Sequence, residues 1–150
     1  MKKFIKLAAL LLWMALIFIM SNQKDVQSEI SSNLVAEIIY QIYSHIFTNV
    51  IDVSTFMSKY VGPIRKLAHF SEFAILGILA YINIEEYRKD KVFVYSLLFK
   101  ILYAISDEIH QLFVEGRYCS IGDMLIDSLG ALTGILIFHL INNRWIKKSY

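Results

Sequence analysis

Four long stretches of the chain are almost entirely apolar, and charged segments separate them. They cover Phe4–Met20, Leu67–Ile84, Val92–Val114 and Asp123–Ile141. A helix needs about 20 mostly apolar residues to cross a hydrocarbon layer of about 30 Å. The pattern therefore predicts four membrane-spanning helices. Pro63 precedes the second stretch, and we expect it in the first turn of that helix, where a missing N–H costs nothing.

The first stretch has an alternative interpretation. Basic residues followed by an apolar run also describe a secretory signal peptide, which ends in small residues at its cleavage site. The run Phe18-Ile19-Met20-Ser21-Asn22 lacks small residues at both of the required positions. An uncleaved span is therefore the favoured interpretation.

The segment 30–60, between the first two predicted spans, is amphipathic. Leu34, Ile38, Ile42 and Ile46 recur every four residues, and polar residues occupy other positions. This spacing places the apolar side chains on one face of a helix. Such a helix can lie in the outer membrane interface, or it can pack on the outer ends of the spans. The sequence leaves both arrangements open.

The composition excludes several classes of protein. The chain of 150 residues is 57% hydrophobic and 19% charged, whereas soluble domains are about 45–50% apolar and about 25% charged. A net charge of +2 does not favour nucleic-acid binding. A single cysteine, Cys119, excludes an internal disulfide and a CxxC zinc pattern. The sequence predicts one all-α domain over residues 1–150, an integral membrane four-helix bundle with an additional amphipathic interfacial helix between spans one and two.

Basic residues predict the orientation, because short cytoplasmic loops are rich in Lys and Arg. They gather before the first span, between the second and third, and after the fourth: Lys2, Lys3, Lys6, Arg88, Lys89, Lys91, Arg144, Lys147 and Lys148. With four spans these groups share one side, so both termini are expected in the cytoplasm. Lys100 falls inside the third span. We expect it to snorkel toward the cytoplasm, and the alternative is a polar bundle interior.

Polar residues cluster where the second span begins, where the third ends and where the fourth begins. The members are Arg65, His69 and Glu72, then Asp107, Glu108, His110 and Gln111, then Asp123 and Asp127, with Arg117 in the last loop. In the four-span topology all of these positions lie at one level on the outer side. Gly130 and Gly134 continue the stripe of Asp123 and Asp127, and this spacing lets another helix approach closely.

Acids outnumber permanent cations in this layer, which suggests shared protons or a bound cation. The alternative is a network of buried salt bridges that only fixes the positions of the helices. Ionisable groups inside a membrane are costly and mark functional sites by default. A functional site is therefore the favoured interpretation.

The ordered motifs Arg65-Lys66-Leu67-Ala68-His69-Phe70-Ser71-Glu72-Phe73, Asp107-Glu108-Ile109-His110-Gln111-Leu112-Phe113, Glu115-Gly116-Arg117 and Asp123-x-x-x-Asp127-x-x-Gly130-x-x-x-Gly134 resemble the VanZ-like family. The similarity runs from about Arg65 to Gly134. Two positions depart from the family pattern, which commonly has Asn at Asp127 and Pro-Gly-Arg at Glu115-Gly116-Arg117. The first departure adds a negative charge to the expected site.

The resemblance implies a multi-pass protein of the bacterial plasma membrane. Founding members of the family are associated with resistance to teicoplanin and related glycopeptides. By fold-level analogy the family has been grouped with membrane enzymes that act on lipid head groups or lipid-linked envelope precursors.

Two functions of different class follow as hypotheses. As an enzyme, the protein would bind a lipid phosphate through Arg65, Arg117 and His110, with His69, Glu72, Glu108, Gln111, Asp123 and Asp127 as the catalytic group. Asp107, with the neighbouring carboxylates, would hold a divalent cation such as Mg²⁺ or Mn²⁺. As a non-enzymatic protein, it would use the same pocket to bind a lipid or an antibiotic and alter access to the cell surface. The sequence does not decide whether the protein is an enzyme.

Overall fold

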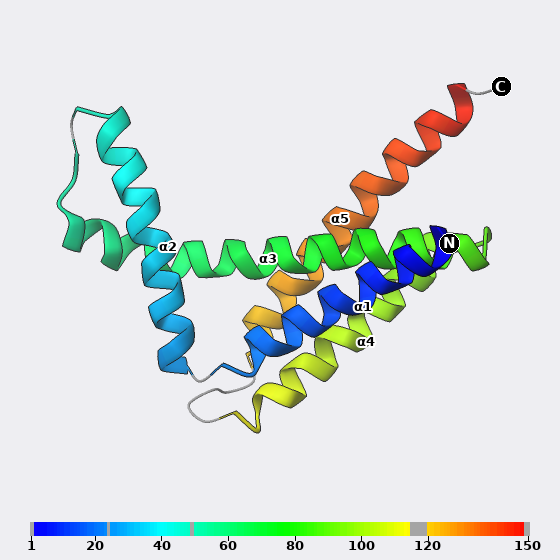
Figure 1. Cartoon of the computed structure of the whole chain (residues 1–150), viewed down its shortest axis with the longest axis horizontal. Coiled ribbons are helices and arrows are strands. Elements are labelled where there is room, and N and C mark those ends of the chain that lie inside the picture. The colour runs from blue at the N-terminus through cyan, green and yellow to red at the C-terminus, as the bar shows by residue number, and fades with distance from the viewer. Residues whose placement is uncertain (1, 24, 49, 115–119, 149–150) are drawn as a thin grey trace.

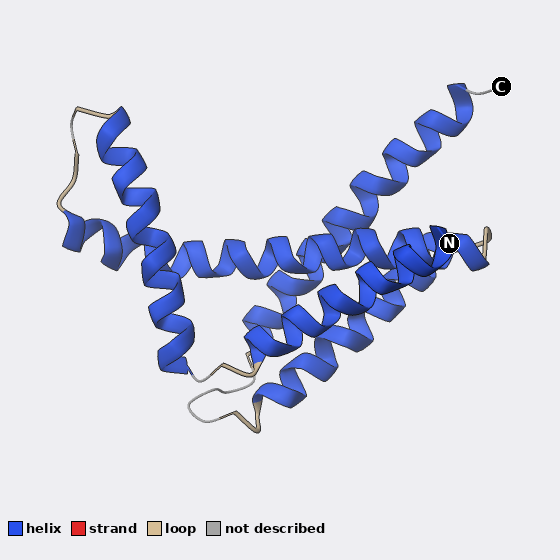
Figure 2. Ribbon diagram, in the orientation of Figure 1, coloured by secondary structure: helices blue, strands red, loops and turns tan. Residues whose placement is uncertain are grey.

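The computed structural model describes residues 2–23, 25–48, 50–114 and 120–148, and within these ranges every regular element is an α-helix. In chain order the helices are α1 (Lys2–Ser21), α2 (Asp25–Ile46), α3 (Val53–Tyr87), α4 (Val92–Gln111) and α5 (Ile121–Lys148). Helices α1, α3, α4 and α5 pack together, whereas α2 projects from the far end of α3 (Figures 1 and 2). The all-α prediction is confirmed.

The four packed helices alternate in direction. The start of α1 meets the end of α3, where Lys6 Nζ lies 2.5 Å from Glu86 Oε2. At the opposite end, Gln111 Nε2 of α4 donates to Ser21 Oγ of α1 over 2.9 Å. We call these the basic end, where α1 starts and α3 joins α4, and the acidic end, where α1 and α4 finish and α5 begins. This arrangement of helix ends is the one that the predicted topology requires.

The closest helix crossing joins α3 and α5. A Cβ built on Gly130 would lie 2.2 Å from the carbonyl oxygen of Phe70, and one on Gly134 would lie 2.1 Å from that of Ala74. From the other helix, a Cβ on Gly77 would lie 2.7 Å from the carbonyl oxygen of Ala131. Hydrogen is therefore the side chain that fits at these three positions. The close approach predicted from Gly130 and Gly134 is confirmed.

The start of α3 differs from the prediction. The helix begins at Val53, not near Leu67, and Pro63 lies inside it. Asp52 starts the helix because its carboxylate accepts from Ser54 N over 3.0 Å, and a capped end can form well before the apolar stretch. Because proline has no N–H, Pro63 cannot donate a hydrogen bond to the carbonyl oxygen of Lys59. Both residues are exposed, so water can satisfy that oxygen. The single segment predicted over 30–60 is therefore shared between α2 and α3.

The other ends differ less. Helix α4 stops at Gln111, three residues before the predicted end of its stretch, and α5 extends on both sides of the predicted 123–141. Helix α1 covers the predicted 4–20 with small extensions.

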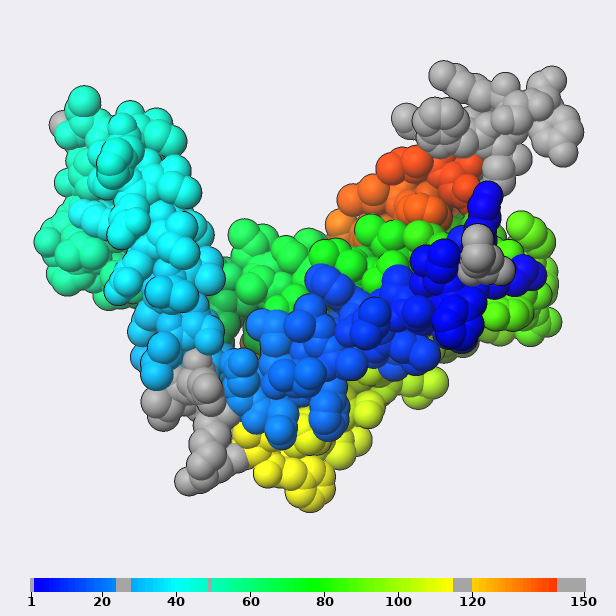
Figure 3. Space-filling view, viewed as in Figure 1, coloured from blue at the N-terminus to red at the C-terminus, as the bar shows by residue number. Residues whose placement is uncertain are grey.

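Aromatic side chains join α2 to the start of α3. The ring of Phe56 lies 5.2 Å from that of Tyr40 and 5.8 Å from that of Tyr43, and Ala36 is fully buried. The predicted apolar stripe points elsewhere, because Leu34, Ile38, Ile42 and Ile46 are each at least half exposed: 60%, 50%, 56% and 66%. Figure 3 shows how far α2 stands from the rest of this face. An amphipathic helix is therefore present, and its apolar stripe is not covered by protein.

Three helices are long and apolar enough to cross a membrane among the residues that the structure describes: α1, α3 and the Ile121–Asn142 part of α5. The core where they meet α4 is built from Leu10, Ile17, Phe73, Leu76, Ala80, Ala104 and Ala131. Helix α4 is 20 residues long, as α1 is. It carries the charged residues Lys100, Asp107 and Glu108 within its length.

Candidate functional site

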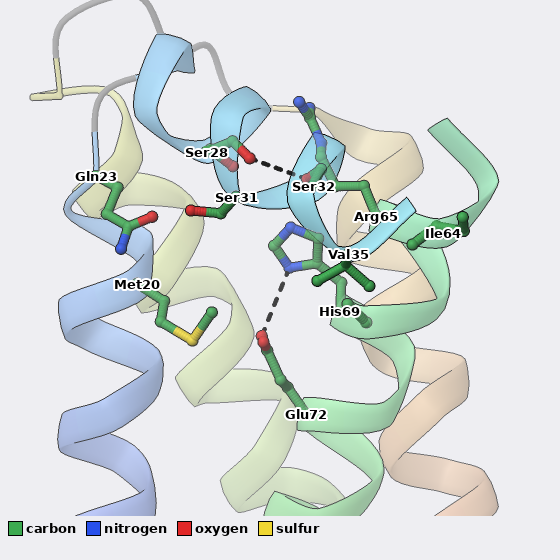
Figure 4. Close-up of a pocket in the computed structure, with 11 residues that line it drawn as sticks. Met20, Gln23, Ser28, Ser31, Ser32, Val35, Ile64, Arg65, His69 and Glu72 are labelled. Atoms are coloured by element: carbon green, nitrogen blue, oxygen red, sulfur yellow. Dashed lines mark hydrogen bonds and ion pairs between the residues drawn. The ribbon is translucent and has the colours of Figure 1, made fainter. Parts of the chain in front are cut away.

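A polar pocket of about 110 Å³ opens at the acidic end, between the end of α1, the start of α2 and the middle of α3. Helix α3 contributes the predicted residues Arg65, His69 and Glu72, which four-and-three spacing places on one face. We call this the Arg65 pocket. Figure 4 shows His69 near its centre, between Arg65 and Glu72.

Helix α2 supplies polar groups that the sequence analysis missed. Ser28, Ser31 and Ser32 line the pocket, and Gln23 lies beside them at the end of α1 (Figure 4). Ser32 Oγ donates to Ser28 O over 2.9 Å. Spaced serines in the first turns of an amphipathic helix were a visible signal, but nothing in the sequence indicated that this helix folds back over α3.

His69 and Glu72 form the titratable pair of the pocket. His69 Nδ1 lies 3.9 Å from Glu72 Oε2, and both side chains are mostly buried. Trp13 of α1 fixes the backbone below them, because its Nε1 donates to Glu72 O over 2.9 Å. A carboxylate beside a histidine can orient the ring and stabilise its protonated form.

A second polar group lies deeper, where α4 ends. Gln111 Nε2 donates to Asp107 Oδ2 over 3.0 Å as well as to Ser21 Oγ. Glu108 is 2% exposed and accepts from Ser120 N over 3.0 Å, which ties the end of α4 to the start of α5. Asp107 lies within electrostatic range of His69 and Glu72, so this group borders the Arg65 pocket.

Lys100 corrects a prediction. It was expected to snorkel toward the basic end, but its side chain is fully buried in the bundle, with Nζ 4.5 Å from the centre of the Phe73 ring. It lies within electrostatic range of Asp127, which is 2% exposed. Lys100 shares the buried face of α4 with Asp107 and Gln111, so packing that face turns the lysine inward.

Two other predicted residues, His110 and Asp123, do not belong to the described lining of the pocket. His110 stacks on Phe18 of α1, with ring centres 4.4 Å apart. Asp123 lies in the first turn of α5, where its backbone N–H donates to Ser120 Oγ over 3.2 Å. Arg117, with Glu115, Gly116 and Cys119, lies outside the described residues. Most of the described members of the predicted set therefore fall into two neighbouring groups: the Arg65 pocket and the group at the end of α4.

Metal binding receives no support from geometry. Among the described residues, no group of three or more His, Cys, Asp or Glu side chains is placed to hold a metal ion. The donors of the second group are instead engaged with Gln111, Ser120 and neighbouring charges. The predicted Mg²⁺ or Mn²⁺ site at Asp107 stays a prediction.

Comparison with known proteins gives one family. The model of the VanZ/LLP1 family matches residues 6–142, nearly the whole chain. No curated protein and no solved structure matches the chain.

Proposed function

This chain belongs to the VanZ/LLP1 family, and we propose that it is a four-span protein of the bacterial plasma membrane that binds the anionic head group of a lipid or lipid-linked envelope precursor in the Arg65 pocket. The observation that carries the proposal is the pocket itself, in which Arg65, His69 and three serines meet at the acidic end of the bundle.

Helix α4 supports a fourth membrane crossing because it buries polar side chains and exposes apolar ones, the reverse of a helix in a water-soluble protein. Its buried side chains include Ser96, Lys100, Asp107, Glu108 and Gln111. Apart from Ser106, its exposed side chains are large and apolar: Val94, Leu98, Ile101, Leu102, Ile105 and Ile109. A helix that turns its polar face inward and its apolar face outward suits an apolar solvent. Twenty residues extend about 30 Å, the thickness of the hydrocarbon layer.

The position of the pocket suits a lipid head group. It lies at the level where α1 ends, so it faces the membrane interface if α1 crosses the hydrocarbon layer. Helix α2 forms one wall and runs steeply across the direction of α3 (Figure 1). With α3 along the membrane normal, the exposed apolar stripe of α2 lies along the interface. Lipid could then enter the pocket beneath α2.

The chemistry of the lining suits a phosphate. A guanidinium binds phosphate through two parallel hydrogen bonds, and Arg65 supplies one from the pocket wall. His69 adds a donor, and the serine hydroxyls are neutral groups that do not repel an anion, with the donor of Ser32 engaged by Ser28 O. Basic residues gather at the other end, which supports a cytoplasmic location for that end and an outer location for the pocket. By occupying outer head groups, the protein would alter the access of glycopeptides to the cell surface.

The His69–Glu72 pair favours a second candidate, hydrolysis or transfer at the bound head group. His69 would accept the proton of an attacking hydroxyl as its oxygen bonds to the phosphorus, and Glu72, 3.9 Å away, would stabilise the resulting imidazolium. The imidazolium would then return the proton to the departing alcohol oxygen as its bond to the phosphorus breaks. Arg65 would neutralise charge on the phosphate.

The test compares variants in lipid nanodiscs, with binding of phosphatidylglycerol measured against phosphatidylcholine by native mass spectrometry. We expect Arg65→Gln to weaken phosphatidylglycerol binding by about tenfold, the effect of about 1.4 kcal/mol from a charge-assisted contact. Lys66→Gln removes the same charge from the exposed neighbouring position outside the lining and should change binding little. Equal losses in both variants would mean that surface charge, not the pocket, attracts the lipid.

Turnover separates the two candidates. Under the enzymatic proposal, His69→Gln should abolish release of a head group from a panel of anionic lipids while binding persists. Binding without turnover in the unaltered protein across that panel would leave the binding function and reject the enzyme.

A further inference from the structure

Three buried side-chain polar atoms lack hydrogen-bond partners among the described residues: Lys100 Nζ, Asp127 Oδ1 and His110 Nε2. The first two interact with each other. Lys100 is fully buried and Asp127 is 2% exposed. They belong to α4 and α5 and lie within electrostatic range of each other, and Phe73 of α3 covers the ammonium. The pair uses none of the residues that line the Arg65 pocket.

Such atoms are costly to leave unsatisfied. A buried donor or acceptor without a partner costs about 1–3 kcal/mol, and more when it is charged. Buried waters satisfy groups of this kind when at least two polar partners surround them. The Lys100 ammonium is a donor and the Asp127 carboxylate an acceptor, so together they supply two polar partners for a water.

The acidic end provides a polar route to this pair. Asp127 lies within electrostatic range of Asp107 and Glu108 on α4, and of Asp123 one turn earlier on α5. Glu108 in turn accepts from Ser120 N at the start of α5. Carboxylates therefore continue from the outer layer to the depth of Lys100.

The route is closed toward the basic end. Leu76, Ala80, Ala131 and Ile135 are all fully buried there. The backbone of Ala131 presses against Gly77, where a Cβ would come within 2.7 Å of Ala131 O. Packing of this kind leaves no room for water.

We propose that Lys100 and Asp127 form the floor of a water-filled half-channel that opens at the acidic end and exchanges protons with that side of the membrane. A proton that leaves the Lys100 ammonium passes through water to the Asp127 carboxylate, which leaves a neutral amine and a neutral acid. Asp107, Glu108 and Asp123 are the charged groups that face Asp127 and relay protons to the surface. This function is independent of lipid binding in the Arg65 pocket.

Infrared spectroscopy of the purified protein tests the exchange. We expect a carboxylic-acid band that changes with pH, shifts in D₂O and disappears in Asp127→Asn. The double variant Lys100→Met/Asp127→Asn removes both charges together, so it retains a neutral core if a single substitution prevents folding, and it should also lack the band. A spectrum without an Asp127-dependent band that responds to pH would overturn the proposal, because the pair would then be a fixed ion pair.

Thiol labelling tests the side from which water enters. Ala104 and Ala80 belong to the same core and are 2% and 0% exposed, so static burial does not distinguish them. Ala104 is one turn from both Lys100 and Glu108, on the proposed route, whereas Ala80 lies among the apolar side chains toward the basic end. In a Cys119→Ser background, A104C should react with a small impermeant thiol reagent added to the acidic-end side, and A80C should not. Protection of both variants, or equal reaction of both, would reject the half-channel.

Discussion

Gly134 lies against the backbone of Ala74, so closely that a Cβ on the glycine would come within 2.1 Å of the alanine carbonyl oxygen. Backbone cannot move aside as a flexible side chain can. We predict that Gly134→Ala separates α3 from α5 and lowers the free energy of unfolding by about 1–3 kcal/mol, the usual cost of overpacking. Unfolding by denaturing detergent, followed by circular dichroism, measures the loss.

The matched control is Gly62→Ala in α3, where a new Cβ would meet nothing within 4 Å. Alanine forms helix better than glycine by about 1 kcal/mol, so this variant should be as stable as the unaltered protein or more so. Similar losses in the two variants would contradict the close crossing.

Ser21 and Gln111 are predicted to be energetically coupled, because their 2.9 Å hydrogen bond joins the ends of α1 and α4. In a double-mutant cycle, Ser21→Ala and Gln111→Leu should show a coupling energy of about 0.5–1.5 kcal/mol in unfolding. The control pair is Ser21 with Thr133, whose hydroxyl bonds to Leu129 O within α5. Additive effects in the first pair would mean that the contact does not form.

The sequence predicted the parts of this fold that depend on periodicity. Spacing of four placed Gly130 and Gly134 on one stripe and the apolar residues of α2 on another, and both patterns are found. It did not predict that α3 begins at Val53, because the Asp52 cap is a local signal that lies far from the apolar stretch. It also misplaced Lys100, whose direction depends on which face of α4 the other helices bury.

The sequence predicted which acidic and basic residues belong to the candidate site. It did not predict that they divide into the Arg65 pocket and a second group at the end of α4. The alternating helix directions bring Glu72 and Asp107 to the acidic end, as predicted, and Asp127 lies one turn further into α5 than Asp123, within electrostatic range of Asp107. The path of α2 determines which of these residues share a pocket. The sequence was compatible with two paths, along the membrane interface or packed on the ends of the spans. The serines of the Arg65 pocket come from this path, so they could not be identified in advance.

Asp52 gives the start of α3 a predictable response to acid. Hydrogen bonds from the Ser54 hydroxyl and N–H hold the pKa of this carboxyl below its ordinary value of 3.8. A lowered folded-state pKa means that the cap stabilises the helix above pH 3.8 and is lost as the pH falls through the folded-state pKa. Amide hydrogen exchange near Phe56 should therefore accelerate in acid, relative to amides in the middle of α3. In Asp52→Asn, which keeps a capping oxygen, that acceleration should be absent, and its persistence would assign it to another group.

The exposed stripe of α2 is predicted to contact lipid. In a background with both natural tryptophans replaced by phenylalanine, Ile42→Trp introduces a fluorophore on the stripe, where the side chain is 56% exposed. Gln41→Trp introduces one at a neighbouring exposed position outside the stripe. A helix lying in the interface buries its apolar face about 5–10 Å into the boundary between head groups and acyl chains. Lipids brominated on their acyl chains should therefore quench the tryptophan of I42W more strongly than that of Q41W. Equal weak quenching would place α2 in water, and the wall of the Arg65 pocket would then lack the lipid contact that the proposed function requires.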